Sequence, residues 1–589
     1  MKFPYGLSDF GTLILEHYFY QDRTAFIPTL EDAGRQLLFL RPRRFGKSLL
    51  LSMLEHYYDL NRANQFTDLF GHLAIGQQPT PLHNQFFVMK WDFSLVKAQG
   101  DLKDIEAALH QHINDCIETF SCYYQTKLTR PITVHADNAL SSWRSALMAV
   151  QQTPHKLYLL IDEYDNFANE VMMAHQENYA SLLYGEGLLK TVFKAVKAAA
   201  GGMGLDRVFI TGVSPVVLSD MTSGYNVAKN IYLNKEFNAL CGFTETEIAE
   251  VLVMVHQEQA EWPVTGALDT MRTFYNGYRF SSRATESVYN PTLSLYFLES
   301  VYRYGQYPEQ LLDENLAMDR NKLAYIASLD HGQELLIQAL APAQLTIAHL
   351  AQRFGVEDML TIAKDQTVMA SLLYYFGILT LAGVDDRLGR LQLQIPNLVA
   401  RSLYVEKLQE LWLTGYEDRE NITSVAEACY LKGDLQPLCG FIEQRYFKIL
   451  SSRDYQCANE LMIKIMFMTL LNNDSLYMMV SELELKPGYL DLAMILRPDV
   501  RQYQALDLLI EFKYLNLQEL KQTGAQLAAL STEALARLPL VISKLEDATQ
   551  QAQRYGKSLQ QRYPQAKLHR FAVVALGLER LVWREVSEE

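Results

Sequence analysis

Short apolar runs alternate with longer helical patterns between about residues 36 and 240. Helix-length segments separate the runs, which is typical of a parallel sheet covered by helices on both faces. We therefore expect an N-terminal α/β domain over residues 1–242. Its predicted buried strands are residues 36–40, 86–91, 157–161 and 207–211.

From residue 243 the pattern becomes largely helical. Thr244 precedes Glu247 by three residues, as in the capping box that begins many helices. We interpret residues 243–420 as a helical lid and linker region. A smaller α/β domain is predicted over residues 421–589. Its expected elements are a helix over 456–471 and strands over 478–485, 490–496, 506–512 and 570–576.

A candidate phosphate-binding loop follows the first predicted strand. The sequence there is Arg41-Pro42-Arg43-Arg44-Phe45-Gly46-Lys47-Ser48. A strand, a turn ending in Gly-Lys-Ser and a helix direct backbone N–H groups and the positive helix end toward a phosphate. Lys47 would neutralise the β- and γ-phosphates of ATP, and Ser48 would bind Mg²⁺. Arg41 replaces the usual first glycine, so a basic helix N-terminus without a ligand is the alternative.

Acidic and hydroxyl residues follow two further predicted strands. Asp162 and Glu163 come directly after the third, where one carboxylate would approach Mg²⁺ and the other the attacking water. Thr211 or Ser214, at the end of the fourth, would sense the γ-phosphate or the water, and a strand-end turn is the alternative. The expected nucleotide-binding residues are Arg43, Arg44, Phe45, Gly46, Lys47, Ser48, Asp162, Thr211 and Ser214.

A second candidate site lies in the predicted C-terminal domain. Asp491 enters one strand, and Glu511 and Lys513 leave the next, so a hairpin would bring two carboxylates and an ammonium together. Carboxylate oxygens suit Mg²⁺ or Mn²⁺, and a metal with a lysine can generate hydroxide and stabilise a pentacovalent phosphate. A charged hairpin end without a metal is the alternative.

Motifs along nearly the whole chain resemble the AAA-ATPase-like family that is commonly fused to a PD-(D/E)XK nuclease domain. They are residues 41–48, 160–165, 211–214, 241–244, 274–280, 289–291 and 373–380. The resemblance implies an additional-strand P-loop ATPase fold and a restriction-endonuclease-like α/β domain. It also implies that arginine is usual at position 41.

The resemblance adds three expectations for the C-terminal domain. Glu460, on the helix before the strands, would be a further metal ligand. Gln551 and Tyr555 would lie one turn apart on the following helix, with the glutamine facing the site. Tyr489 departs from the family, which usually has arginine there, and this departure weakens the expected contact with a phosphate.

These features predict a protein that binds and hydrolyses ATP and whose ATP state controls metal-dependent cleavage of DNA. The expected cofactors are ATP and Mg²⁺, with Mn²⁺ as an alternative in the nuclease domain. The expected catalytic residues are Glu163, Asp491, Glu511 and Lys513. The expected metal ligands are Ser48, Asp162, Glu460, Asp491 and Glu511.

Two other functions remain open from the sequence. One is a signalling-type ATPase switch whose C-terminal domain binds nucleic acid or protein without cleavage, which Tyr489 and the acidic composition favour. The other is a non-catalytic interaction protein that uses the aromatic residues Tyr374, Tyr375 and Phe376, although such runs are more often core.

The composition limits the partners. A formal net charge of −15 argues against attraction of nucleic acid to the whole surface, so contact would be confined to a local basic patch. The sequence has no secretory signal pattern and no run of about 18 uncharged apolar residues. We therefore expect a cytoplasmic protein with no membrane partner, and a homo-oligomer is compatible with the sequence.

Overall fold

The computed structural model describes residues 1–97, 100–166, 188–215, 227–258, 264–312, 317–341, 345–352, 354, 365–385, 387–413, 415–450, 459–485 and 488–587. Contacts group the chain into two compact units, each built from separate segments. The first contains Met1–Val264, Asn276–Gly305 and Thr346–Gln394, and the second contains Thr265–Tyr275, Gln306–Leu345 and Ile395–Glu589. The division into residues 1–242, 243–420 and 421–589 stays a prediction.

A five-stranded parallel sheet forms the core of the first unit. Its strands lie in the order β2 (Phe86–Asp92), β3 (Lys156–Asp162), β4 (Leu205–Gly212), β1 (Gln36–Leu40) and β5 (Lys229–Asn230). The four predicted strands are confirmed. The two-residue β5 had no prediction, because it is too short to show a pattern. Since β4 lies between β1 and β3, the strand before the phosphate-binding loop and the strand ending at Asp162 are not neighbours.

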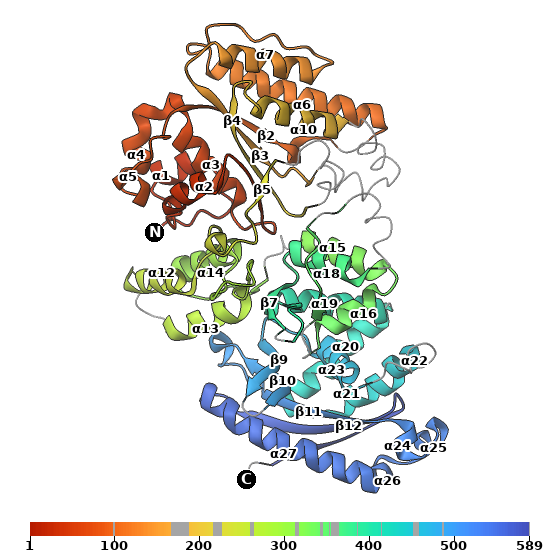
Figure 1. Ribbon diagram of the computed structural model, residues 1–589. Coiled ribbons are helices and arrows are strands. Elements are labelled where there is room, and N and C mark those ends of the chain that lie inside the picture. The colour runs from red at the N-terminus through yellow and green to blue at the C-terminus, as the bar shows by residue number, and fades with distance from the viewer. Residues whose placement is uncertain are drawn as a thin grey trace. The chain divides into compact units, whose positions relative to one another are not determined.

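Helices cover both faces of this sheet (Figure 1). The helices α6 (Leu102–Tyr123), α7 (Ala139–Gln151) and α10 (Leu188–Ala200) lie along one face, and α3 (Lys47–Tyr58) lies on the other. Burial on both faces explains why the inner strands are apolar throughout. The expected α/β fold class is therefore confirmed. Shorter helices beside α3 are α1 (Phe10–Leu15), η1 (Thr24–Phe26), α2 (Ile27–Ala33), η2 (Leu60–Gln65), α4 (Phe66–Phe70) and α5 (Ala74–Gln77).

The region after β5 contains more than helices. Its helices in the first unit are α12 (Glu245–Glu258), α14 (Pro291–Tyr304) and α18 (Gln366–Tyr375). Thr244 and Glu247 form the expected hydrogen bonds at the start of α12, in both directions. A three-stranded sheet joins β6 (Leu345–Ile347), β8 (Leu391–Gln394) and β7 (Thr380–Val384). The sequence analysis expected a largely helical region and did not predict these short strands.

The second unit is built on a mixed sheet. Its order is β13 (Arg580–Val586), β12 (Leu568–Leu576), β11 (Asp507–Leu515), β10 (Gly488–Leu496) and β9 (Tyr477–Leu485). Only β11 and β12 pair in parallel. Figure 1 shows α27 (Pro539–Arg562) along one face, and α23 (Glu460–Leu471) packs against β10 and β11. The four predicted strands are confirmed, and β13 was missed.

The second unit contains further helices. They are α13 (Val264–Tyr275), α15 (Ala317–Ser328), α16 (Gly332–Ala339), α19 (Leu398–Trp412), α20 (Tyr416–Lys432), α21 (Gln436–Phe441), a π-helical turn (Ile442–Tyr446), α22 (Phe447–Leu450), α24 (Leu517–Leu520), α25 (Gly524–Ala528) and α26 (Thr532–Ala536). In the part of the chain that the structure describes, no helix has both the length and the apolar character needed to cross a bilayer.

Candidate ATPase and nuclease sites

The loop between β1 and α3 has an unusual backbone. Gly46 has a φ of 85° and Arg44 a φ of 67°, both in the left-handed region. This region suits glycine and costs other residues roughly 1 kcal/mol. The carbonyl of Arg44 accepts a hydrogen bond of 2.8 Å from the Thr292 hydroxyl at the start of α14. The tertiary contact helps to hold Arg44 in a conformation that its side chain disfavours.

Lys47 lies folded against this loop. Its ammonium donates to the carbonyls of Arg41 and Pro42, both at 3.0 Å, and its side chain is almost fully buried. Burial lowers the pKa of Lys47, and the nearby carboxylates of Glu163 and Asp162 partly offset this effect. The predicted lysine therefore lies beside both predicted acidic residues.

Asp162, the last residue of β3, accepts hydrogen bonds from side chains on two other elements, α3 and β4. One oxygen of its carboxylate accepts from the Ser48 hydroxyl at 2.7 Å, and the other accepts from the Thr211 hydroxyl at 2.5 Å. Because β4 lies between β1 and β3, Thr211 reaches Asp162 from the neighbouring strand. Ser48 and Asp162 are the pair of oxygen donors that suits Mg²⁺. The structure thus brings the two expected metal ligands of this domain into contact.

Glu163 follows with its own backbone in the left-handed region, at a φ of 49°. Its N–H donates to Asp162 at 3.0 Å. Burial raises the pKa of Glu163, while Lys47 and Arg43 act in the opposite direction. Arg43 itself donates to the Asn166 side chain. This carboxylate sits beside the metal-ligand pair, in a position suited to a base.

Ser214 has a different partner from Thr211. Its N–H and hydroxyl both donate to Asp165 at 2.8 Å, and Asp165 also accepts from the N–H of Val213. Gly212 makes this approach possible, because a Cβ atom there would lie 2.5 Å from the Asp165 carboxylate. Of the two predicted hydroxyl residues, Thr211 contacts Asp162 and Ser214 fastens the turn after β4.

Arg41, which occupies the position of the missing glycine, is buried. Its guanidinium donates to the carbonyls of Leu40, Tyr232 and Phe237 and lies 4.0 Å from the ring centroid of Phe280. Burial lowers the pKa of Arg41 to about 10. This arginine therefore anchors the start of the loop to a neighbouring segment, a role that the sequence pattern did not reveal.

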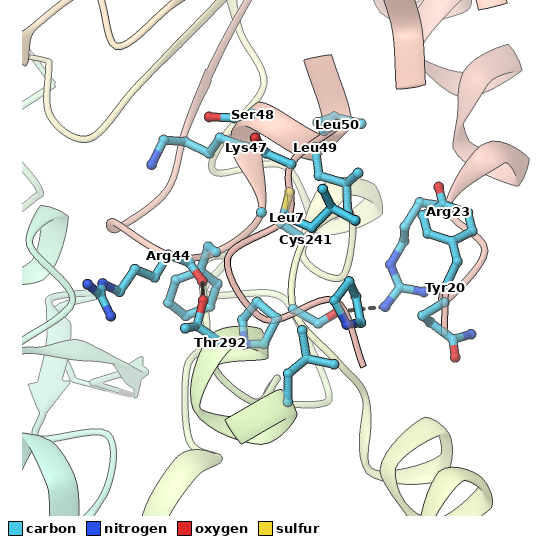
Figure 2. Close-up of a pocket in the computed structure, with 18 of the residues that line it drawn as sticks. Leu7, Tyr20, Arg23, Arg44, Lys47, Ser48, Leu49, Leu50, Cys241 and Thr292 are labelled. Atoms are coloured by element: carbon cyan, nitrogen blue, oxygen red, sulfur yellow. Dashed lines mark hydrogen bonds between the residues drawn. The ribbon is translucent and has the colours of Figure 1, made fainter. Parts of the chain in front are cut away.

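A cavity of about 260 Å³ opens beside the loop (Figure 2). Lys47, Ser48 and Glu163 line its polar end, and Tyr20, Leu7 and Cys241 line apolar parts of its wall. In Figure 2, Arg44 and Arg23 lie on opposite sides of the cavity. Phe45 packs edge-on against Tyr278 and Phe280 and so belongs to the support of the loop. The cavity therefore combines apolar walls with the predicted nucleotide-binding residues Lys47 and Ser48.

The second site lies where β10 and β11 separate. Leu492 is the last residue of β10 that pairs with β11, opposite Ile510. At the next residue on each strand, backbone N–H groups donate to side-chain carboxylates in place of backbone carbonyls. There the Phe512 N–H donates to the Asp491 carboxylate at 2.9 Å, and the Asp491 N–H donates to Glu511 at 3.3 Å. Burial first, and then the charge of Asp491, raise the pKa of Glu511 well above its usual value. The two predicted carboxylates are therefore adjacent.

Lys513 and Glu460 complete the predicted set. The Lys513 ammonium donates to the Phe512 carbonyl at 2.7 Å and lies 3.6 Å from the Glu460 carboxylate. Tyr489, two residues before Asp491 on the same strand, is 53% exposed. On α27, Tyr555 is buried and Gln551 is partly buried. Among the described residues, no three His, Cys, Asp or Glu side chains are grouped closely enough to hold a metal ion.

Two cations near this site were not anticipated. Lys464, one helical turn after Glu460, is 2% exposed and lies near Asp491, Glu460 and Glu511. Burial lowers the pKa of Lys464 to about 8. Arg401 on α19 donates to the Ser481 hydroxyl at 2.6 Å and to its carbonyl at 3.1 Å. A lysine inside the apolar run of α23 was the available sequence signal.

The aromatic residues Tyr374, Tyr375 and Phe376 are buried in the first unit. The Tyr374 hydroxyl donates to the Phe280 carbonyl, and the Tyr375 hydroxyl donates to the Ala351 carbonyl. Their burial removes the surface that a non-catalytic interaction protein would have used.

Comparison with known proteins finds a related sequence and solved structures of low similarity. Over 424 residues the chain is 25% identical to an uncharacterized protein in the vnfD 5' region of Azotobacter chroococcum mcd 1, covering 69% of this chain and 70% of that protein. It is also similar to two solved structures from Aeropyrum pernix. The first is ORC1 in complex with DNA, with 9% identity and a TM-score of 0.26, and the match covers 67% of this chain and 96% of that chain. The second is ORC2 in its ADPNP–ADP complexes, with 12% identity and a TM-score of 0.28, and the match covers 66% of this chain and 92% of that chain.

Two family models match defined segments of the chain. Residues 4–222 match the AAA-ATPase-like family, described as a predicted AAA-ATPase. Residues 458–585 match a PD-(D/E)XK nuclease superfamily. The chain therefore carries an AAA-ATPase-like domain at its N-terminal end and a domain of the PD-(D/E)XK nuclease superfamily at its C-terminal end.

Proposed function

We propose that the N-terminal domain binds and hydrolyses ATP with Mg²⁺, and that its ATP state controls cleavage of DNA by the C-terminal domain. The observation that carries the proposal is the pairing of Ser48 with Asp162 beside Lys47 in one unit. The adjacent Asp491 and Glu511 near Lys513 in the other unit support the nuclease part.

In the ATPase domain, each residue has a distinct task. Lys47 exchanges its hydrogen bonds with two loop carbonyls for contacts with the β- and γ-phosphates. Ser48 and Asp162 would hold Mg²⁺, which neutralises charge on the phosphates. Glu163 orients the attacking water and accepts its proton. Thr211, bonded to Asp162, keeps that carboxylate in one orientation. The apolar wall of the cavity receives the base.

In the nuclease domain, Asp491 and Glu511 would hold the divalent cation. When bound, the cation lowers the pKa of a water molecule and polarises the phosphodiester. Lys513 supplies a positive charge to the pentacovalent phosphate, and Glu460, 3.6 Å from Lys513, positions that ammonium. DNA is the proposed partner, bound at a local basic patch because the chain as a whole is acidic.

A cleavage assay tests the nuclease part. Single- and double-stranded DNA and RNA are incubated with the full chain, with and without ATP and Mg²⁺. We expect Mg²⁺-dependent cleavage of DNA, and at least about a 100-fold loss of rate in Lys513→Met, because one electrostatic contact to the transition state is removed. Lys557→Met, which changes an exposed lysine on α27, is the matched control. Equal rates for Lys513→Met and the parent would refute the assignment.

An ATP assay tests the control by nucleotide. Lys47→Ala should lose ATP binding, whereas Glu163→Gln should keep it and lose hydrolysis by about 100-fold or more, the usual effect of removing a general base. The DNA cleavage rate of each variant, with and without ATP, then reports the coupling. Cleavage that responds to ATP identically in Lys47→Ala and in the parent would reject ATP control and leave the nuclease assignment standing.

A further inference from the structure

Tyr489 lies on the same face of the sheet as the nuclease candidates. Side chains alternate between the two faces along a strand, so Tyr489 and Asp491 on β10 share one face. By the same alternation, Glu511 and Lys513 share one face of β11. The proposed cleavage chemistry uses Asp491, Glu511 and Lys513 but gives Tyr489 no task.

The register of the two strands sets Tyr489 at the level of Lys513. Leu492 pairs with Ile510, and each step back along β10 corresponds to one step forward along β11. Two hydrogen bonds through carboxylates join the strands at the next position, where Asp491 lies. Residues at the same level of an antiparallel pair lie on one face of the sheet. Tyr489 therefore borders the carboxylate pair on the side of Lys513.

The reactive groups of this centre are buried, whereas Tyr489 is exposed. Glu511 is 1% exposed and the Lys513 side chain 13% exposed, but Tyr489 is 53% exposed. A phosphodiester must therefore come below the level of the exposed side chains to meet Glu511 and Lys513. A DNA duplex is stiff over about 150 base pairs, whereas a single strand can bend at each nucleotide. The burial of the reactive groups thus favours a flexible strand.

The chemistry of tyrosine also favours an unpaired base. An arginine at this position would contact a phosphate, and phosphates are present in duplexes and single strands alike. Tyrosine has no charge for a phosphate but offers an aromatic face on which a base can stack, as in proteins that bind single strands. Tyr489 is two residues from Asp491, about 7 Å along the strand, so a base next to a phosphate bound there comes within reach.

We propose that the nuclease centre acts on single-stranded DNA, and that an unpaired base next to the scissile phosphate stacks on the ring of Tyr489. The inference rests on the proposed nuclease function and adds the form of its DNA substrate. Stacking holds the strand with its backbone toward Asp491 and Lys513. A base inside a duplex is already stacked on its neighbours and paired, so its face is closed to Tyr489.

A binding assay tests the inference without cleavage. The full chain is titrated in EDTA against fluorescent oligothymidylate and against the same strand paired with oligoadenylate, and anisotropy is measured. Tyr489→Ala should bind the single strand about 10-fold more weakly, because one stacked base is lost, and should bind the duplex as the parent does. Tyr489→Phe keeps the ring and should match the parent. Tyr503→Ala, which removes another exposed tyrosine of this unit, is the matched control.

Two results of this assay would overturn the inference. One is single-strand binding that is unchanged in Tyr489→Ala, and the other is an equal loss of binding to the single strand and to the duplex. Circular dichroism checks that each variant folds.

A cleavage assay with Mg²⁺ and a duplex that carries one single-stranded arm tests the same inference in the parent chain. We expect cuts in the arm, and cuts in the paired part would overturn the inference. Tyr489→Ala should raise KM for the arm by about 10-fold and leave kcat nearly unchanged, because stacking is the same before and during the reaction. Tyr489→Arg should shift cleavage toward the paired part. If the parent cuts no DNA, the proposed nuclease function fails, and the binding assay still decides the role of Tyr489.

Discussion

Arg41 shows how one residue can change the construction of the loop between β1 and α3. Its guanidinium joins the carbonyls of Leu40, Tyr232 and Phe237, while its own carbonyl accepts from Lys47. The Arg41 side chain thus attaches the loop to the segment that contains Tyr232 and Phe237, while the Arg41 backbone contacts Lys47. The flexibility that a glycine would provide is replaced by a fixed attachment to a neighbouring segment.

We predict that restoring the usual glycine destabilises the first unit. Arg41→Gly leaves three carbonyls without this donor and adds backbone entropy to the unfolded chain, at a cost of roughly 3 kcal/mol or more. Thermal unfolding should show an earlier transition for this unit. Arg41→Lys keeps the charge without the planar fork and should lose part of the stability. An unchanged transition in Arg41→Gly would mean that these bonds contribute little.

At the scale of the element, a partly buried ion pair holds the start of α12. Arg23 donates to both oxygens of Glu247, at 2.6 and 2.8 Å, and also to the Gly242 carbonyl. Burial opposes ionisation of Glu247, yet Arg23 and the backbone of Thr244 outweigh it and lower the pKa of this carboxyl. The pair joins the helix to the segment before η1, at the edge of the cavity beside Lys47.

The lowered pKa gives the stability of this unit a pH dependence. Because the pKa of Glu247 is lower in the folded than in the unfolded state, its stabilising effect is present above the unfolded value of 4.5. The effect is lost as the pH falls through the folded value. Glu247→Gln should therefore cost about 1 kcal/mol at pH 7, as for a partly exposed pair, and less near pH 3. Thermal unfolding between pH 3 and 7 measures this, with exposed Glu250→Gln as control.

Elements with long apolar runs could be predicted from the sequence, and those without them could not. The runs that became β1, β3 and β4 are buried on both faces, so their patterns are unambiguous. The strands β6, β7 and β8 have only three to five residues, and β13 ends in the exposed Arg584 and Glu585, so neither shows a clear period.

In the candidate sites, some contacts could be predicted from the sequence and others could not. Lys47 follows β1, Asp162 ends β3, and Asp491 and Glu511 lie on the paired strands β10 and β11. The positions of these residues relative to the predicted strands made their proximity predictable. The contact of Thr292 with the Arg44 carbonyl joins residues about 250 positions apart, and no local pattern encodes such a pair. For the same reason, no local pattern predicts that Arg401 of α19 donates to Ser481 on β9.

At the scale of the whole molecule, the two units are interleaved along the chain. The chain passes from one unit to the other after residues 264, 275, 305, 345 and 394. Within the second unit, buried Arg497 at the end of β10 donates to the carbonyls of Pro308 and Glu309, at 2.9 and 3.2 Å. The nuclease-like sheet thus depends on a segment that lies far ahead of it in the sequence.

We predict that residues 421–589 alone are less stable than the same residues in the full chain. Without residues 308 and 309, Arg497 keeps its ion pair with Asp499 but loses two carbonyl acceptors, and buried donors left without acceptors are destabilising. Hydrogen exchange at the amides of β10 and β11 should be faster in the fragment. Equal protection in both would show that the earlier segments do not support this sheet.

The interleaving also limits how genes for such proteins can be recombined. Suppose that recombination replaced only the residues after 394 with those of a related protein. The new sheet would then have to pack against residues 265–275 and 306–345 of the original protein, whose buried side chains fit the original sheet. Functional hybrids would need all three stretches from the same parent, so this ATPase-like half and this nuclease-like half are expected to be inherited as a pair.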